Sequence, residues 1–244
     1  MKDLIILLTG TITPNSFSNL SIKDPGIRRT QYLEAILFYL KKTKFKIVFV
    51  ENSGDQLKNF PLQPGRIEYL TFESAPIKPD RGKAYKEMEI IDFALQNSNF
   101  LKEAKSVVKI TGRLKVLNIK MLSRKFIKLN KIKSNLVYVY SFNLKNMDSR
   151  CFFFTLDFWP YLKYEGRNIN QRYNFELSLW DATYNYQKLE GKNFLPLDTP
   201  LRIKGLSGAF GHKYKHNLLI HYARFFRYLV IDRWWNERYY IFKK

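Results

Sequence analysis

Three short polar segments, each directly after an apolar run, carry residue types that could bind a ligand. They are Thr9-Gly10-Thr11, Glu51-Asn52-Ser53-Gly54 and Thr111-Gly112-Arg113. In open parallel sheets, ligands bind outside the carboxyl ends of the strands, at the point where the strand order reverses. Each segment alone is also explained as a turn, because Gly and Asn favour turns. The three together predict one cleft lined by Thr9, Gly10, Thr11, Glu51, Asn52, Thr111, Gly112 and Arg113.

Positive charge would reach the same cleft on Arg81, Lys83 and Arg113. A guanidinium group can clamp a diphosphate through two hydrogen bonds. Such a clamp suits a reaction in which a diphosphate is the leaving group, because it stabilises the negative charge that develops on the departing diphosphate. Arg81 and Lys83 could instead belong to a solvated loop, whereas Arg113 directly follows a run that we expect to be buried.

The hydrophobic pattern indicates the elements that would position these residues. Apolar runs predict strands near residues 4–8, 46–50, 67–70, 107–110, 136–140 and 151–155. Helical spacing predicts one buried face made of Leu33, Ile36, Leu37 and Leu40, after Asp24-Pro25, and another made of Ala84, Met88, Ile91 and Leu95. Further helices are expected over residues 116–129 and 171–181. Strands that alternate with helices favour an α/β fold with a mostly parallel central sheet flanked by helices.

Length and composition bound the class of protein. With 244 residues, 45% of them hydrophobic, the chain can build one substantial core, and it carries no repeat or convincing linker. We therefore predict a single domain over 1–244. The lone Cys151 excludes an internal disulfide framework and a cysteine metal cluster, and we expect it to be packed in a cytoplasmic protein. The run LIILL is too short for a secretion signal, and no stretch approaches the roughly 20 apolar residues that cross a bilayer.

The formal net charge of +21 calls for an acidic partner. Nucleic acid, anionic lipid and a phosphate-bearing small molecule all qualify. A nucleic-acid-binding protein or nuclease is the alternative function, because interleaved Tyr, Phe and Arg suit stacking and phosphate contacts. Against it, the chain carries no zinc finger, no RNP-type motif and no coherent helix-turn-helix. No specific nucleic acid is therefore predicted as a partner.

Four segments resemble, in their order and spacing, the GT-A class of bacterial glycosyltransferases. They are IVFVENSG at 47–54, RGKAYKEMEIIDFAL at 81–95, VVKITGR at 107–113 and IKGLSGAFG at 203–211. Within that class, the chain looks like the small enzymes of capsule and lipopolysaccharide biosynthesis. The resemblance implies a GT-A-like, Rossmann-like fold. It also implies a hexosyltransferase-like enzyme, which transfers a sugar from a nucleotide-sugar donor to a surface-polysaccharide or lipid-linked glycan acceptor.

The resemblance also assigns places to individual residues. Thr9, Glu51 and Asn52 would lie near the nucleoside of the donor. The segment 82–87 and Arg113 would lie near the diphosphate and the donor sugar. In the glycine-rich turn at 205–211, Gly205, Ser207 and Gly208 would contact the acceptor.

One departure from the GT-A pattern concerns the metal. Many GT-A enzymes carry an Asp-x-Asp motif after the strand that here ends in Thr111-Gly112-Arg113, where paired carboxylates hold a divalent ion on the diphosphate. The motif is absent there, so we predict that Arg113 and nearby lysines replace the metal and that no cofactor is needed besides the nucleotide-sugar. Lysines surround the three histidines, His212, His216 and His221, and no third metal ligand is indicated to join His212 and His216. All three histidines are therefore expected at the surface.

An inverting transferase also needs a carboxylate to take the proton from the attacking acceptor hydroxyl. The candidates are Asp157, which follows the run CFFFTL, and Glu176, in the segment QRYNFELSLWDA. Glu176 resembles the acidic residue that many GT-A enzymes present after the donor site. Glu87, after the basic loop, is the third choice. Each of them could instead be an ordinary capped or salt-bridged acid.

The segment 217–244 is basic, aromatic and predicted to be helical. Leu218, Tyr222, Phe225 and Leu229 share one face, with Arg224 and Arg227 opposite. Such a helix could dock on anionic lipid and hold the protein peripherally at the inner face of a bacterial membrane. It could equally pack on the sheet.

Overall fold

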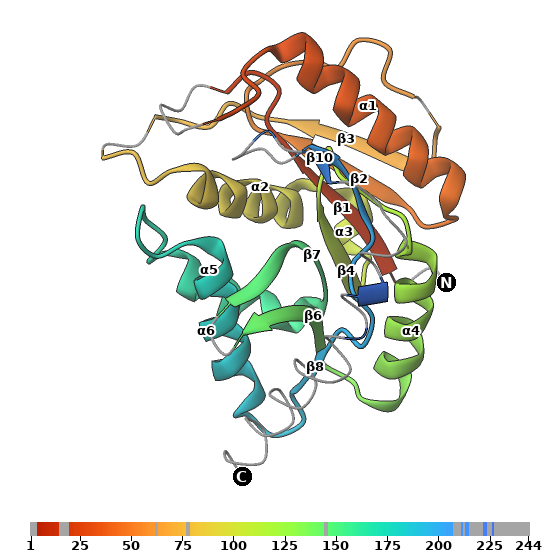
Figure 1. The fold of residues 1–244 in the computed structure, drawn as a ribbon, viewed down its shortest axis with the longest axis vertical. Helices are drawn as coiled ribbons and strands as arrows, with labels where there is room; N and C mark the ends of the chain where they lie inside the picture. Colours follow the sequence, from red (N-terminus) through yellow and green to blue (C-terminus); the bar gives the residue numbers. More distant parts are fainter. Residues whose placement is uncertain are drawn as a thin grey trace.

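The computed structural model describes residues 4–14, 20–61, 63–76, 79–143, 146–206, 211, 213–214, 222–223 and 226. A seven-stranded sheet lies between two layers of helices (Figure 1). Its strand order is β3-β2-β1-β4-β7-β6-β8. These strands are β1 (Leu4–Gly10), β2 (Ile47–Glu51), β3 (Ile67–Thr71), β4 (Ser106–Thr111), β6 (Leu136–Asn143), β7 (Asn146–Thr155) and β8 (Asn193–Pro196).

Most neighbouring strands of this sheet are parallel. The pairs β1–β2, β2–β3, β1–β4 and β6–β8 are parallel, whereas β4–β7 and β6–β7 are antiparallel. The predicted α/β fold with a mostly parallel sheet is confirmed. The strand order reverses between β1 and β4, because β2 and β3 follow on one side of β1 and β4 lies on the other. A ligand site is expected at the carboxyl ends of these two strands.

The helices form one layer on each face of the sheet. α1 (Pro25–Lys42) and α4 (Ile119–Ile132) contribute to one buried apolar cluster. α2 (Lys83–Asn97), α5 (Trp159–Gly166) and α6 (Phe175–Gln187) contribute to the other, with the short α3 (Asn99–Lys102) directly after α2. Cys151 is fully buried in the first cluster, as expected, and burial raises the pKa of its thiol. None of the helices that the structure describes has the length and apolarity needed to cross a bilayer.

α1 shows how the sequence specifies such a helix. Its N-cap is Asp24, whose carboxylate accepts a hydrogen bond from the Ile27 backbone N–H at 2.7 Å. The buried stripe contains Ile36 and Leu40, as predicted, together with Tyr32, Ala35 and Tyr39. The prediction that Leu37 shares this face is wrong, because its side chain is 53% exposed. The two tyrosines complete the stripe, so Leu37 is turned toward solvent.

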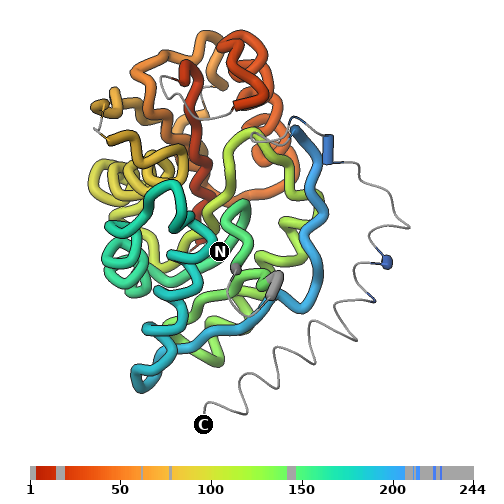
Figure 2. The backbone as a smooth tube through the Cα atoms, turned by 60° about the vertical axis from the view of Figure 1, so that its left-hand side comes forward, coloured from red at the N-terminus to blue at the C-terminus, as the bar shows by residue number. Residues whose placement is uncertain are grey.

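The second half of the chain differs more from the expected elements. The helix expected over 116–129 begins at Ile119, because Val116 belongs to β5 (Lys115–Val116) and pairs with Ile203 of β9 (Ile203–Leu206). Figure 2 shows the blue strand β9 beside the green segment that carries β5. α6 begins at Phe175 rather than near 171, because Asn174 caps it by accepting a hydrogen bond from Leu177 N at 3.0 Å. A 3-10 turn (Leu156–Phe158), α5, β8, β9 and β10 (Lys213–Tyr214) have no counterpart among the predicted elements.

Candidate functional site

The centre of the candidate site is a carboxylate placed where the strand order reverses. Thr9 of β1 and Thr111 of β4 are partners in the strand register. Both hydroxyl groups donate to Oε1 of Glu87 on α2, Thr9 at 3.0 Å and Thr111 at 3.4 Å. Three of the residues predicted from the sequence therefore meet at one point.

Lys109, which the sequence analysis did not single out, is the cation of this site. Its side chain is fully buried, and its ammonium forms an ion pair with Oε1 of Glu87. The ammonium also donates to the Ser149 carbonyl oxygen at 2.7 Å and lies 5.2 Å from the centre of the Phe175 ring. A buried charge needs such partners, because it has lost its water. A single lysine inside the apolar run VVKIT is the sequence signal that could have identified it.

Glu176, one of the candidate bases, is connected to the same cluster through β7. Its Oε1 accepts a hydrogen bond from the Ser149 hydroxyl at 2.6 Å. A chain of contacts therefore runs from Glu87 through Lys109 and Ser149 to Glu176, across α2, β4, β7 and α6. In the part of the chain that the structure describes, neither Glu87 nor Glu176 uses its Oε2 in a hydrogen bond.

Glu51 is fully buried, and its carboxylate accepts hydrogen bonds from the loops around it. Its Oε1 accepts hydrogen bonds from the backbone N–H groups of Ile12, at 2.8 Å, and Ser53, at 2.9 Å. Its Oε2 accepts from Asp55 N and from the Thr71 hydroxyl, both at 3.1 Å. Both carboxylate oxygens are therefore engaged in fixing the loops that follow β1 and β2.

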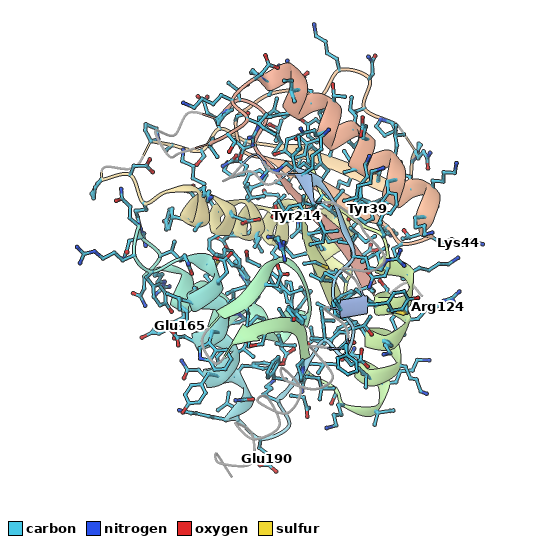
Figure 3. The ribbon with its side chains drawn as sticks, viewed as in Figure 1. Tyr39, Lys44, Arg124, Glu165, Glu190 and Tyr214 are labelled. Atoms are coloured by element: carbon cyan, nitrogen blue, oxygen red, sulfur yellow. The ribbon has the colours of Figure 1, made fainter. Side chains whose placement is uncertain are left out.

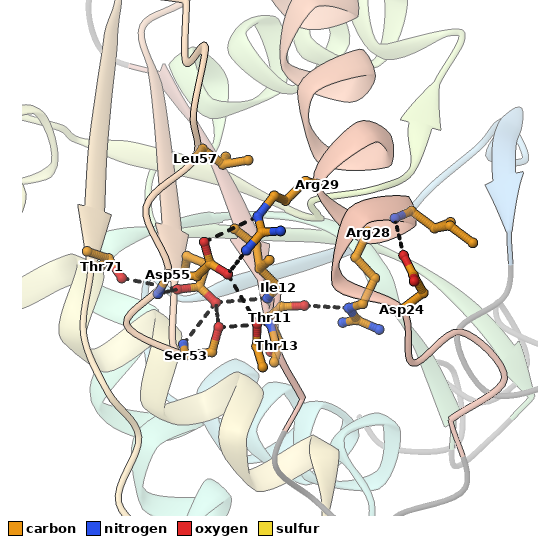
Figure 4. Close-up of polar contacts among 12 residues, drawn as sticks. Thr11, Ile12, Thr13, Asp24, Arg28, Arg29, Ser53, Asp55, Leu57 and Thr71 are labelled. Carbon is orange, nitrogen blue, oxygen red and sulfur yellow. Dashed lines mark hydrogen bonds and ion pairs between the residues drawn. The ribbon is translucent and has the colours of Figure 1, made fainter.

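Asn52 has a buried side-chain donor beside those loops. The Thr11 hydroxyl donates to Asn52 Oδ1 at 2.6 Å, which fixes the orientation of the amide. The Asn52 side-chain nitrogen is buried and has no hydrogen-bond partner among the described residues. Arg28, which the sequence analysis missed, holds the Thr11 backbone by donating from Nε to its carbonyl oxygen at 2.6 Å (Figure 4). Its guanidinium also donates to the Tyr32 hydroxyl at 3.2 Å. An arginine in the first turn of an amphipathic helix gives no sign that it will be buried.

The three predicted cations have different environments. Arg81 donates to the carbonyl oxygens of Ile169, at 2.9 Å, and Arg167, and it stacks on Tyr85, so its guanidinium ties the loop before α2 to the loop after α5. Lys83 is exposed at the first residue of α2. Arg113 is partly buried, and its Nε has no hydrogen-bond partner in the part of the chain that the structure describes.

The predicted glycines allow close approach of backbone. A Cβ at Gly112 would lie 2.6 Å from the Thr9 carbonyl oxygen, and one at Gly10 would lie 2.8 Å from the Phe49 ring. Gly205 adopts φ +144°, and a Cβ there would lie 3.2 Å from the Arg113 carbonyl oxygen, so β9 passes directly beside the predicted cleft. Ser207, Gly208, His212, His216 and His221 lie outside the described residues, as does the segment 217–244 apart from residues 222, 223 and 226.

Asp157 lies away from this cluster. Because β7 is antiparallel to β4, its end at Thr155 is paired with Ser106, at the opposite edge of the sheet from Thr111. The Asp157 carboxylate accepts hydrogen bonds from the Tyr186 hydroxyl at 2.8 Å and from Lys192 at 2.6 Å. The structure thus brings Glu87 and Glu176 together and places Asp157 apart from both.

A metal site would require several ligands close together. Among the described residues, no group of three or more His, Cys, Asp or Glu side chains could hold a metal ion.

Comparison with models of protein families gives no match, and neither does comparison with curated proteins. Several solved structures are similar. A glycosyltransferase involved in the glycosylation of the major capsid of PBCV-1 has 14% identity and a TM-score of 0.48, with 81% of this chain and 82% of that chain covered. A proposed nucleotide-diphospho-sugar transferase from Desulfovibrio desulfuricans G20 has 12% identity and a TM-score of 0.49, with 80% of each chain covered. Rv0371c from Mycobacterium tuberculosis H37Rv has 14% identity and a TM-score of 0.46, with 81% and 90% covered. Likeness this remote does not assign an activity to this chain.

Proposed function

We propose that this protein is a glycosyltransferase that binds a nucleotide-sugar at the carboxyl ends of β1, β2 and β4. The observation that carries the proposal is the cluster around Glu87, which Thr9, Lys109 and Thr111 hold at the reversal point of the strand order. The cluster fixes the ends of β1 and β4 and is linked to Glu176 through Lys109 and Ser149, which suits a reaction that moves a proton next to an anionic leaving group.

The donor end of the proposed reaction uses groups that are still able to donate hydrogen bonds. The Asn52 side-chain nitrogen and Arg113 Nε are buried and find no partner within the described ranges, and a bound ligand with acceptor oxygens would satisfy both. Lys83, at the start of α2, adds an exposed positive charge. We propose that Arg113 and Lys83 neutralise the diphosphate and that the transfer is metal-independent.

Glu176 is the proposed base. Its Oε1 accepts a single hydrogen bond from Ser149, whereas Oε1 of Glu87 is engaged by three donors. In the proposed inverting step, the acceptor hydroxyl forms a bond to the anomeric carbon and its proton passes to the Glu176 carboxylate. The bond from that carbon to the diphosphate breaks, and the electron pair leaves with the nucleotide. Glu87 holds Lys109 and the ends of β1 and β4 in place.

The proposed acceptor is a surface polysaccharide or a lipid-linked glycan, which Gly205 of β9 would contact together with Ser207 and Gly208. What supports this is the position of Gly205, because a Cβ added there would lie 3.2 Å from the carbonyl oxygen of Arg113, a residue of the proposed diphosphate site.

Nucleotide binding tests the proposal first. Thermal stability would be measured at moderate salt with UDP, GDP, CMP and TDP compounds, in EDTA and then with manganese. A ligand at about 100 times its dissociation constant should stabilise the protein by about 2.7 kcal/mol. The shift should be unaffected by EDTA and should be lost in Arg113→Ala. Lys105→Ala is the control, because Lys105 is exposed and directly precedes β4, at the opposite edge of the sheet.

The opposite result would be no shift with any nucleotide, together with binding to DNA or RNA that weakens steeply with salt. That outcome would replace the transferase with the nucleic-acid-binding alternative. A shift that appears only with manganese would keep the donor class and overturn metal independence.

A further inference from the structure

The helix α4 carries a basic stripe that the proposed transferase site does not use. Its sequence, IKMLSRKFIKLNKI, contains no acidic residue. The side chains of Lys120, Arg124, Lys128 and Lys131 are exposed, and their spacing of four, four and three residues places them on one side of the helix. Figure 3 shows Arg124 at the outer margin of the molecule.

The opposite side of α4 packs into the hydrophobic core. Ile119, Leu122, Ser123 and Phe126 are buried, and the apolar members of this group belong to the cluster that packs beneath α1 and α4. The helix is thus already folded and fixed on the sheet. Its basic stripe is presented on a rigid element, so binding a partner there requires no ordering of the backbone.

The four cations of the stripe have no carboxylate partner among the described residues. Lys125, which lies beside the stripe, shows the contrast, since it is paired with Asp198 at 2.5 Å. Like charges in neighbouring helical turns repel one another, and on an isolated surface this repulsion is unfavourable. An extended anionic surface would relieve it.

Two exposed apolar side chains border the stripe. Met121 is 41% exposed and Ile132 is 72% exposed. On a helix, residues 121 and 132 project in nearly the same direction, because they are eleven residues, or about three turns, apart. The exposed side of α4 therefore combines a row of cations with an apolar edge.

We infer that the exposed side of α4 docks on an anionic phospholipid surface. Lys120, Arg124, Lys128 and Lys131 would lie against the headgroups, while Met121 and Ile132 would enter the boundary with the acyl chains. The apolar edge favours lipid over nucleic acid, since phosphate contacts alone make no use of it. This inference does not depend on the transferase activity.

The test is sedimentation of the full-length protein with vesicles of phosphatidylcholine, alone or mixed with phosphatidylglycerol. The variant Lys120→Gln/Arg124→Gln/Lys128→Gln/Lys131→Gln removes the stripe. The control is Lys42→Gln/Lys58→Gln/Lys102→Gln/Lys105→Gln, which removes the same number of charges from exposed lysines on other segments. Both variants should fold, because all eight side chains are exposed. Circular dichroism and melting temperature would be compared first to check this.

We expect binding to the mixed vesicles only, and a loss of about 100-fold or more in partitioning for the stripe variant. The control variant should lose less than about tenfold, because charges far from the surface are screened within about 8 Å. Met121→Ser/Ile132→Ser should weaken vesicle binding several-fold and leave binding to heparin unchanged.

Three outcomes would overturn the inference. Equal losses in the stripe and control variants would mean that net charge alone drives the association. Unchanged binding in the stripe variant would assign the membrane contact to another part of the chain. Binding to DNA that needs the stripe, with no vesicle binding and no effect of Met121→Ser/Ile132→Ser, would make α4 a nucleic-acid surface.

Discussion

Lys109 and Glu87 form an ion pair in which the lysine side chain is fully buried. The ammonium charge depends on this carboxylate and on the Ser149 carbonyl oxygen, because burial has removed its water. Lys109→Met keeps an unbranched apolar side chain, one atom shorter, and leaves Glu87 without its cation. We expect the change to lower the free energy of unfolding by about 3 kcal/mol, measured by urea denaturation.

The matched control for this change removes both charges. Replacing both members of a buried ion pair by uncharged residues often changes the free energy of unfolding little. Lys109→Met/Glu87→Gln should therefore regain at least about half of the stability that Lys109→Met loses. An unfolding midpoint of Lys109→Met equal to that of the unchanged protein would show that the pair contributes nothing to stability.

Replacing the proposed base should lower turnover and leave donor binding unchanged. Glu176→Gln keeps the hydrogen bond from the Ser149 hydroxyl but cannot take a proton. We expect kcat to fall by about 100-fold or more, with the KM for the donor little changed. Steady-state transfer assays with the donor named by the thermal-shift panel would measure this.

The control for the assay is Asp92→Asn, an acid on α2 whose carboxylate pairs with Lys163. This variant should keep full turnover. If Glu176→Gln is as active as Asp92→Asn, Glu176 is not the base, and Glu87→Gln becomes the variant to assay.

The close approach of β1 and β4 makes a prediction at Gly112. Its N–H donates to the Thr9 carbonyl oxygen at 2.8 Å, and a Cβ would lie 2.6 Å from the same oxygen. Backbone atoms of a paired strand cannot move aside as a side chain can, so Gly112→Ala should cost about 2 kcal/mol or more in stability. Thermal or urea unfolding would measure the loss.

Gly26→Ala is the matched control, because a Cβ at this position in the first turn of α1 meets only the end of the Asp24 side chain, at 3.1 Å. The free energy of unfolding of Gly26→Ala should stay within about 1 kcal/mol of that of the unchanged protein, since alanine is the better helix former. Equal stability of both alanine variants would mean that β4 shifts freely relative to β1.

The first half of the fold could be predicted from the sequence, because its strands are continuous apolar runs covered on both faces. The ends of those runs also predicted that Thr9 and Thr111 would share a site, and Glu87 followed from its place after the basic loop. Ser149 could not be predicted, since its role depends on the register of the antiparallel pair β4–β7, which no local pattern specifies.

The same limit explains two other residues. Glu51 was predicted to lie near a ligand, yet its oxygens are engaged by the loops around it, because a carboxylate at a strand end serves a turn as readily as a ligand. Arg28 was missed because its partners, the Thr11 and Ile22 carbonyl oxygens, are brought near it only by the path of the preceding loop.

Asp157 should make stability depend on pH in a defined direction. Burial alone would raise the pKa of its carboxyl group, but hydrogen bonds from Lys192, Thr155 and Tyr186 together hold that pKa below its ordinary value. A carboxyl group with a lowered folded-state pKa adds stability above its unfolded pKa of about 3.9, and the contribution is lost as the pH falls through the folded value. Asp157→Asn should therefore destabilise the protein most at neutral pH, by about 1 kcal/mol for this partly exposed group.

The measurement is urea unfolding of Asp157→Asn and of the unchanged protein from pH 7 downward. Their difference in stability should shrink below about pH 4, where both forms of the side chain are uncharged. Asp198→Asn is the control, because the Lys125–Asp198 pair is about half exposed on both sides and should contribute less than about 1 kcal/mol at any pH. A difference for Asp157→Asn that grows as the solution is acidified would mean that its partners favour the protonated carboxyl group, contrary to the contacts with Lys192 and Tyr186.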